Sequence, residues 1–260
     1  MIIPYPVRTG KHLRFPGENF FLRPAAQALL RLTYPTPYAT FLRTDFHFLR
    51  SEKVPFFATG KYLPNRIVFF FRQALEGTMG RTAVDRIWLG AGPRDECLLP
   101  VMDDLEKAVD FSCFSALCSS IEKVYGEEGA RAILHRSGRM AFSRTLRSTA
   151  ALVGLEGPHL YAQSGSDRIS AGLLSVTRLL SLLSDMECSV ASTPQGYRFS
   201  VTGCPECAGR TCGGSLCHSV AGMLRGALDW FGIDPGIPVV ETDCIACGAA
   251  GCNFSISDSF

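Results

Sequence analysis

The sequence has no long apolar run, no strong excess of either charge and no signal-peptide pattern. Its densest apolar stretch, residues 67–71, is far short of the ~18–20 residues that a membrane helix needs. The formal net charge is only +2, which gives no overall case for nucleic-acid binding. The N-terminus lacks a basic start followed by an apolar core and a cleavage site. We therefore expect a cytoplasmic protein whose cysteines are reduced or bind metal.

Two regions of the chain differ in composition. Residues 1–65 hold nine Lys or Arg against three Asp or Glu, a net charge of +6, and eight of the 15 prolines. Because prolines interrupt regular structure, we expect a basic, Pro- and aromatic-rich extension there, either loosely ordered or docked on a partner or a membrane surface. The remainder, residues 66–260, is long enough for one folded domain with a full core.

Apolar residues recur at helical spacing over much of the region from 66 to 183, which predicts a set of amphipathic helices. Gly77 and Gly80 are the expected breaks of the first helix, Gly126 is expected to separate later ones, and Gly154 to end the last of these. The expected helices cover residues 66–89, 110–124, 127–137, 140–153 and 169–183.

After residue 184 the apolar period changes to two, which indicates strands. Residues 194–196, Pro-Gln-Gly, are typical of a turn, so residues 186–201 are expected to form a hairpin. A helix and two further strands follow, over residues 215–231, 237–241 and 253–257. The order β-β-α-β-β behind a set of helices predicts an α+β fold, with N-terminal helices packed on a twisted antiparallel sheet.

Seven of the 11 cysteines lie after residue 203, and three of them can converge with one carboxylate on a metal ion. Glu241 ends an expected strand, Cys244 follows it, and Cys252 begins the return strand after a glycine-rich loop. Cys217, at the start of the preceding helix, can pack against this strand pair. One carboxylate and three thiolates form a closed tetrahedral set with no position for a reactive water, so we expect a structural zinc site.

Four further cysteines lie outside that set: Cys204, Cys207, Cys212 and Cys247. They are either reduced, partly buried thiols or the ligands of a second metal, which would be zinc or an iron–sulfur cluster. The two-residue gap between Cys204 and Cys207 suits a zinc knuckle. A cluster would give the protein a redox role, although the spacings match no ferredoxin pattern.

The metal pattern belongs to a wider motif, made of Cys217, Glu241, Cys244, Gly248, Cys252 and Phe254. This motif resembles the C-terminal signature of the 4-vinyl reductase domain family. The family includes ligand-sensing domains of phenol-responsive transcription activators and hydrocarbon-binding proteins of bacteria and archaea. Residues 125–139 are similar to the helix–Gly–helix entry of the family, and the resemblance covers about residues 66–257.

The resemblance implies that residues 66–260 form a ligand-binding domain with a C-terminal metal site. The family's fold is similar to the NO-signalling/Golgi-transport ligand-binding fold of vesicle-tethering and haem–nitric-oxide-binding domains, which is often dimeric. It also implies that the zinc ligands are Cys217, Glu241, Cys244 and Cys252. The cysteines at 204, 207, 212 and 247 depart from the family's quartet, which leaves open a second metal or a redox function.

A ligand pocket in such a domain would lie between the helices and the sheet, with mostly apolar walls. Aromatic side chains are the candidates for its lining, although each would also suit a plain core. These candidates are Trp88, Phe111, Phe114, Phe142, Tyr161 and Trp230.

We therefore expect a zinc-stabilised domain that binds a small apolar or aromatic molecule and acts as a sensor or carrier. Its output would pass through a homodimer or a partner protein, with no nucleic acid and no membrane span. Two alternatives stay open. One is a reductase or redox protein of (bacterio)chlorophyll-type vinyl reduction with a metal or iron–sulfur centre, and the other is an assembly protein with a filled core. No other catalytic signature is present, so we favour a binding module over an enzyme.

Overall fold

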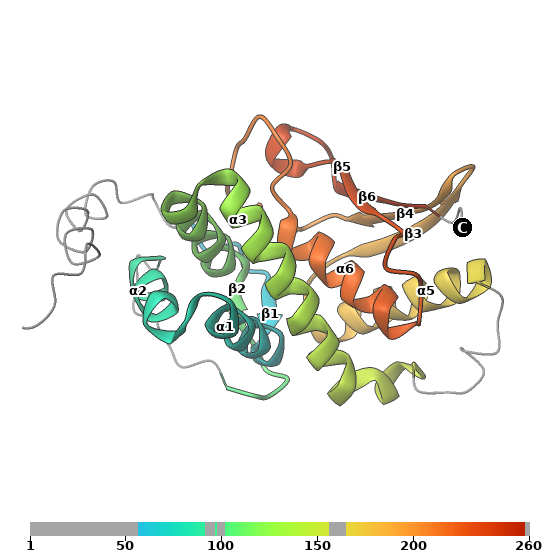
Figure 1. Ribbon diagram of the computed structural model, residues 1–260, viewed down its shortest axis with the longest axis horizontal. Helices are drawn as coiled ribbons and strands as arrows, with labels where there is room; N and C mark the ends of the chain where they lie inside the picture. The colour runs from blue at the N-terminus through green and yellow to red at the C-terminus, as the bar shows by residue number, and fades with distance from the viewer. Residues whose placement is uncertain (1–56, 92–96, 98–101, 156–164, 258–260) are drawn as a thin grey trace, which may run out of the picture. The chain divides into compact units, whose positions relative to one another are not determined.

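The computed structural model describes residues 57–91, 97, 102–155 and 165–257 (Figure 1). Most of the expected 1–65 extension lies outside these residues. The elements in chain order are β1 (Tyr62–Pro64), α1 (Asn65–Met79), α2 (Arg81–Ala91), β2 (Lys107–Asp110), α3 (Phe111–Thr149), η5 (Ala150–Val153), α5 (Gly165–Leu183), β3 (Cys188–Thr193), β4 (Gly196–Val201), α6 (His218–Trp230), β5 (Val239–Asp243), η6 (Ile245–Cys247) and β6 (Cys252–Ser257).

The predicted α+β fold with a β-β-α-β-β order is confirmed. The four C-terminal strands form one antiparallel sheet in the order β3-β4-β6-β5. In its centre β4 pairs with β6 so that Val201 lies opposite Cys252, which brings the loop after β4 beside the start of β6. A second sheet, β1 with β2, was not predicted, because strands of three and four residues are too short to show a period.

One of the predicted helix boundaries, that between residues 137 and 140, is absent from the structure. The first helix ends at Gly80, which has a φ of 85°, as expected for one of its two candidate breaks. The helices expected over 110–124, 127–137 and 140–153 form one long helix, α3, kinked at Gly126, where φ is 71°. No break occurs near Gly138. That glycine serves a close helix contact and does not end a helix.

The close contact joins α3 to α6, which lies beside it in Figure 1. A Cβ added at Gly138 would lie 2.1 Å from the carbonyl oxygen of Ser219, and one at Gly222 would lie 2.0 Å from that of His135. The two backbones therefore touch where these glycines stand. Residues 219–228 of α6 are all buried, which is typical of a helix that is covered on every side.

Two cysteines depart from the expectation of reduced thiols. Cys97 is joined by a disulfide to Cys113, which lies in the first turn of α3. Their separation of 16 residues carries no signal that distinguishes this pair in the sequence. The other nine cysteines are free. No helix in the described ranges has both the length and the apolar character needed to cross a membrane.

We expect Gly222→Ala to lower the free energy of unfolding by about 1–3 kcal/mol, because its methyl group would force α6 away from the His135 carbonyl. Urea unfolding followed by circular dichroism measures this. Gly77→Ala is the matched control, since a Cβ at Gly77 in α1 meets no atom within 4 Å, and it should be neutral or stabilising by up to about 1 kcal/mol. Equal losses in the two variants would contradict the close-contact explanation.

Candidate metal centre and adjoining pocket

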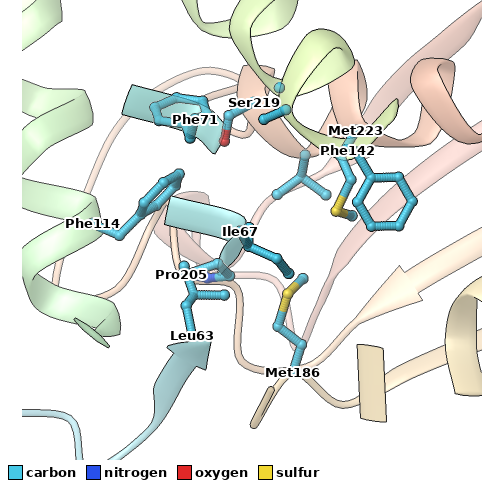
Figure 2. Close-up of a pocket in the computed structure, with 12 residues that line it drawn as sticks. Leu63, Ile67, Phe71, Phe114, Phe142, Met186, Pro205, Ser219 and Met223 are labelled. Atoms are coloured by element: carbon cyan, nitrogen blue, oxygen red, sulfur yellow. The ribbon is translucent and has the colours of Figure 1, made fainter. Parts of the chain in front are cut away.

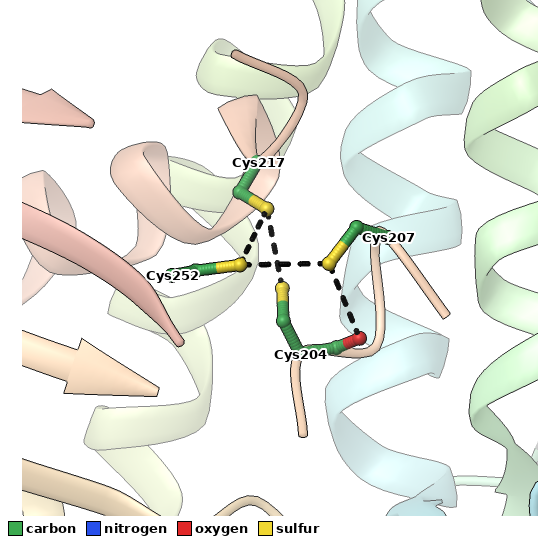
Figure 3. A group of neighbouring side chains, drawn as sticks. All are labelled: Cys204, Cys207, Cys217 and Cys252. Carbon is green, nitrogen blue, oxygen red and sulfur yellow. Dashed lines mark hydrogen bonds between the residues drawn. The ribbon is translucent and has the colours of Figure 1, made fainter. Parts of the chain in front are cut away.

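Four cysteines from three segments converge at the N-terminal end of α6 (Figure 3). Cys204 and Cys207 lie in the loop after β4, Cys217 stands directly before α6, and Cys252 begins β6. The sulfur of Cys204 lies 3.3 Å from that of Cys217, and the sulfur of Cys252 lies 3.5 Å from those of Cys207 and Cys217. All four are buried, so together they form a thiol-lined site inside the protein.

The spacing of these sulfur atoms fits a single tetrahedral ion. Zinc–sulfur bonds of about 2.3 Å in a tetrahedron place the sulfur atoms about 3.8 Å apart. The four sulfur atoms lie within 4.8 Å of one another. The four cysteines of an iron–sulfur cluster are divided among two or four iron atoms and so need a wider arrangement. The geometry thus favours an ion over a cluster.

A second group of donors overlaps with the first. Cys217, Glu241, Cys244 and Cys252 also place one ligand atom each within 4.8 Å of one another. The sulfur of Cys244 lies 3.8 Å from that of Cys217 and 4.0 Å from that of Cys252. The structure therefore brings together all four residues that the sequence pattern selects as a zinc quartet.

The hydrogen bonding of Glu241 indicates whether this second group of donors fits a metal ion. Its Oε2 accepts a hydrogen bond of 3.0 Å from the backbone N–H of Cys217. Its Oε1 is buried and has no hydrogen-bond partner among the described residues. A buried carboxylate oxygen without a partner is costly. A cation between this oxygen and the three sulfur atoms would remove that cost, so the donor set fits a metal ion.

The expected second set of Cys204, Cys207, Cys212 and Cys247 is divided in the structure. Cys204 and Cys207 lie with Cys217 and Cys252, whereas Cys212 and Cys247 are exposed. The N–H of Cys212 donates to a backbone oxygen in η6, and the thiol of Cys247 lies 3.1 Å from the carbonyl oxygen of Gly214. These two residues connect the loops around the centre from outside.

The sequence analysis missed Glu206, which lies between the first two cysteines. Its side chain is fully buried and accepts hydrogen bonds from the N–H and hydroxyl of Ser219, at 2.8 and 2.6 Å, and from the N–H of Val220 at 3.2 Å. With Glu241 on Cys217, two carboxylates satisfy the first amides of α6, which have no partner within the helix. The only feature of the sequence that could have indicated this role is the position of Glu206 between Cys204 and Cys207.

Burial raises the pKa of Glu206 to about 8, although the hydrogen bonds from Ser219 and Val220 favour the charged form. Hydrogen bonds from neighbouring thiols lower the pKa of Cys207, and the bond with Cys204 has the largest effect. A hydrogen bond with Cys217 lowers the pKa of Cys244. A divalent ion would favour the charged form of every donor around it.

Arg210 anchors the cysteine loop to α3. Its guanidinium pairs with the carboxylate of Glu122 and also donates to the backbone oxygen of Glu206 at 3.4 Å. Both partners of this ion pair are largely buried. The loop between β4 and α6 is therefore fixed at Arg210 as well as at its cysteines.

An apolar pocket lies next to the centre (Figure 2). Its cavity volume of about 30 Å³ holds a water molecule or two by size, and a larger molecule would enter only if side chains moved. The walls come from β1, α1, α3 and α6 and from the loops before β3 and after β4. The lining residues are Leu63, Ile67, Phe71, Phe114, Gly138, Ala141, Phe142, Met186, Pro205, Ser219, Val220 and Met223.

Two of the six predicted aromatic residues, Phe114 and Phe142, line this pocket. Trp88 and Phe111 are buried in the core, and Trp230 is packed against it, but none of these three is among the lining residues. Tyr161 lies outside the described residues. Phe71, whose ring centre lies 5.0 Å from that of Phe114, was missed, because helical periodicity marks buried residues without separating core from pocket.

The pocket and the metal centre share a wall. Pro205 lines the pocket and lies between Cys204 and Glu206, and Ser219 lines it while donating to Glu206. A molecule in the pocket would therefore touch the loop that carries two of the thiols.

We expect Glu206→Ala to lower the free energy of unfolding by about 1–3 kcal/mol, because the buried N–H groups of Ser219 and Val220 would lose their acceptor. Glu206→Gln, which keeps one acceptor oxygen, should lose less. Chemical denaturation measures both. Glu127→Ala, at an exposed position of α3, is the control and should change stability by less than about 0.5 kcal/mol. A neutral Glu206→Ala would contradict the capping role.

Comparison with known proteins identifies the fold. No protein-family model and no curated protein matches the sequence. An H-NOX protein from S. oneidensis in the Fe(II)NO ligation state is similar in structure, with a TM-score of 0.53 and 12% identity over 75% of this chain and 100% of that one. A triple mutant of an S. oneidensis H-NOX protein in the Fe(II) ligation state gives 0.52, with 13% identity over 76% and 98%. The Fe(II) unliganded H-NOX protein from K. algicida gives 0.51, with 12% identity over 75% and 96%.

The expected likeness to the NO-signalling ligand-binding fold is thus confirmed at the level of the fold. The pocket of this chain lacks the residues that would bind the iron named for those proteins. The residues that line it include no histidine, cysteine or tyrosine, and its volume of about 30 Å³ cannot hold a haem. The residues around this pocket therefore do not fit a haem.

Proposed function

We propose that this chain is a zinc-stabilised binding module for a small apolar or aromatic molecule, and that it acts as a sensor or carrier. The observation that carries the proposal is the apolar pocket between α1, α3 and α6, whose wall includes Pro205 of the cysteine loop. Membership of the 4-vinyl reductase domain family, from the C-terminal motif, is part of the proposal. So is output through a homodimer or a partner protein.

The pocket suits an apolar ligand because its walls are almost entirely carbon and sulfur. The polar side chain in it, that of Ser219, donates its hydroxyl to Glu206 and so is already engaged. Met186 and Met223 lie on the wall, and unbranched methionine side chains adapt readily to a new neighbour. Engineered apolar cavities of about 150 Å³ bind benzene, so moderate side-chain movement would make room for one aromatic ring.

The metal supports this function by holding the wall in place. A structural zinc fixes the segments that bear its ligands and contributes to folding. The reductase alternative gains no support from the sulfur spacings, which are those of tetrahedral ion sites and not of an iron–sulfur cluster. A cytoplasmic setting is kept in the proposal because a centre rich in thiols needs them reduced, although Cys97 and Cys113 are bonded.

We expect toluene to raise the melting temperature of the full chain in a concentration-dependent manner, because a ligand that binds only the folded state stabilises it. Ala141→Leu should abolish this shift, since Ala141 is buried on the pocket wall. The substitution itself should cost about 1–3 kcal/mol through overpacking. Differential scanning fluorimetry and titration calorimetry measure the shift and the affinity.

Ala151→Leu, the same change at an exposed position of η5, is the matched control and should keep the response. Metal content measured on each variant separates a filled pocket from a damaged centre. A toluene response that is equal in both variants would place binding elsewhere. No response in the parent chain would favour the assembly-protein alternative, in which the interior stays closed.

A further inference from the structure

The two donor groups at the centre are each complete, and they share two members. One consists of Cys204, Cys207, Cys217 and Cys252, and the other of Cys217, Glu241, Cys244 and Cys252. Each supplies four ligand atoms, which is the number that zinc takes in a structural site. Cys217 and Cys252 are common to both, so six residues stand around two adjoining positions.

The distances fit two tetrahedra that share an edge. The shared sulfur atoms of Cys217 and Cys252 are 3.5 Å apart, near the edge of about 3.8 Å for a zinc–thiolate tetrahedron. On one side, Cys204 and Cys207 lie 3.3 and 3.5 Å from one shared sulfur each. On the other side, Cys244 lies 3.8 and 4.0 Å from the two shared sulfur atoms.

A single ion would leave some of the six donors outside its coordination shell. An ion among the four cysteines leaves Oε1 of Glu241 buried and unpaired. An ion in the group with Glu241 leaves Cys204 and Cys207, both 2% exposed, outside its coordination shell, each in contact with a bound sulfur atom, that of Cys217 at 3.3 Å or that of Cys252 at 3.5 Å (Figure 3). Only an ion in each position coordinates all six residues.

The surroundings suit the charge of such a centre. Five thiolates and one carboxylate carry six negative charges, of which two divalent ions neutralise four. The positive end of the α6 dipole lies at Cys217, the residue before its first turn. The N–H of Ile245 also donates to the sulfur of Cys252 at 3.4 Å, and such bonds stabilise a thiolate.

We propose that this centre binds two divalent ions, with zinc as the preferred metal, bridged by the thiolates of Cys217 and Cys252. Cys204 and Cys207 complete the inner ion, and Glu241 and Cys244 complete the outer one. Each cysteine releases its proton to solvent when the metal binds, and no change of oxidation state is involved. The exposed Cys212 and Cys247 have no part in either position.

The first test is the metal content of the full chain, purified under reducing conditions, with X-ray absorption at the zinc edge. The expected result is two zinc ions per chain, a first shell dominated by sulfur and a zinc–zinc scattering path. One zinc per chain, or iron with sulfide, would overturn the proposal. This measurement needs no variant, so it decides even if the substituted proteins fail to fold.

Substitutions then test each position. Cys207→Ser and Cys244→Ser should each reduce the content from two ions to one, whereas Cys252→Ser should lose both. Cys247→Ser, next to the centre but exposed, is the matched control and should keep two. Unchanged metal in Cys207→Ser would overturn the proposal. Toluene binding is measured separately, so a content of one zinc would leave the pocket function standing.

Discussion

The buried N-terminus of α6 is the constraint on which the centre and the pocket both depend. Its first N–H groups lie inside the protein, where water cannot reach them, so they need acceptors from elsewhere in the chain. Glu206 supplies an acceptor from the loop after β4, and Glu241 supplies one from strand β5. Both segments lie next to cysteines in the chain, and Cys217 stands at the helix end between them. Capping the helix therefore assembles the thiol-lined site at the same point.

The glycine-lined contact between α3 and α6 sets where this point lies. Because Gly138 and Gly222 let the two backbones touch, α6 approaches α3 too closely for large side chains to separate them. A small space remains beside the contact, lined by Phe114 and Phe142 of α3 and by Pro205 of the cysteine loop. The pocket is thus a consequence of one close helix crossing, and its small volume follows from the same packing.

The sequence predicted the features that depend on local pattern. Helical and strand periods located most of the elements, and the quartet around Glu241 was recognisable because Cys244 and Cys252 flank one loop. The proximity of Cys204 and Cys207 to Cys252 could not be recognised, since it depends on Val201 lying opposite Cys252 in the sheet. That register is a long-range property. The helix break expected between residues 137 and 140 is absent for the same reason, because Gly138 packs against Ser219, which is 81 residues further along the chain.

In the proposed function, the shared wall would let a bound metal act on the ligand pocket more strongly than a bound ligand acts on the metal. Pro205 is held between Cys204 and Glu206, so an ion on Cys204 and Cys207 fixes the wall that a ligand must meet. A ligand, in contrast, pushes on Pro205 through apolar contacts that are individually worth little. Metal binding should therefore shape the pocket, and occupancy of the pocket should adjust the loop without releasing the metal. In the proposed module, the ion pair between Arg210 of this loop and Glu122 of α3 would carry such an adjustment from the loop to that helix.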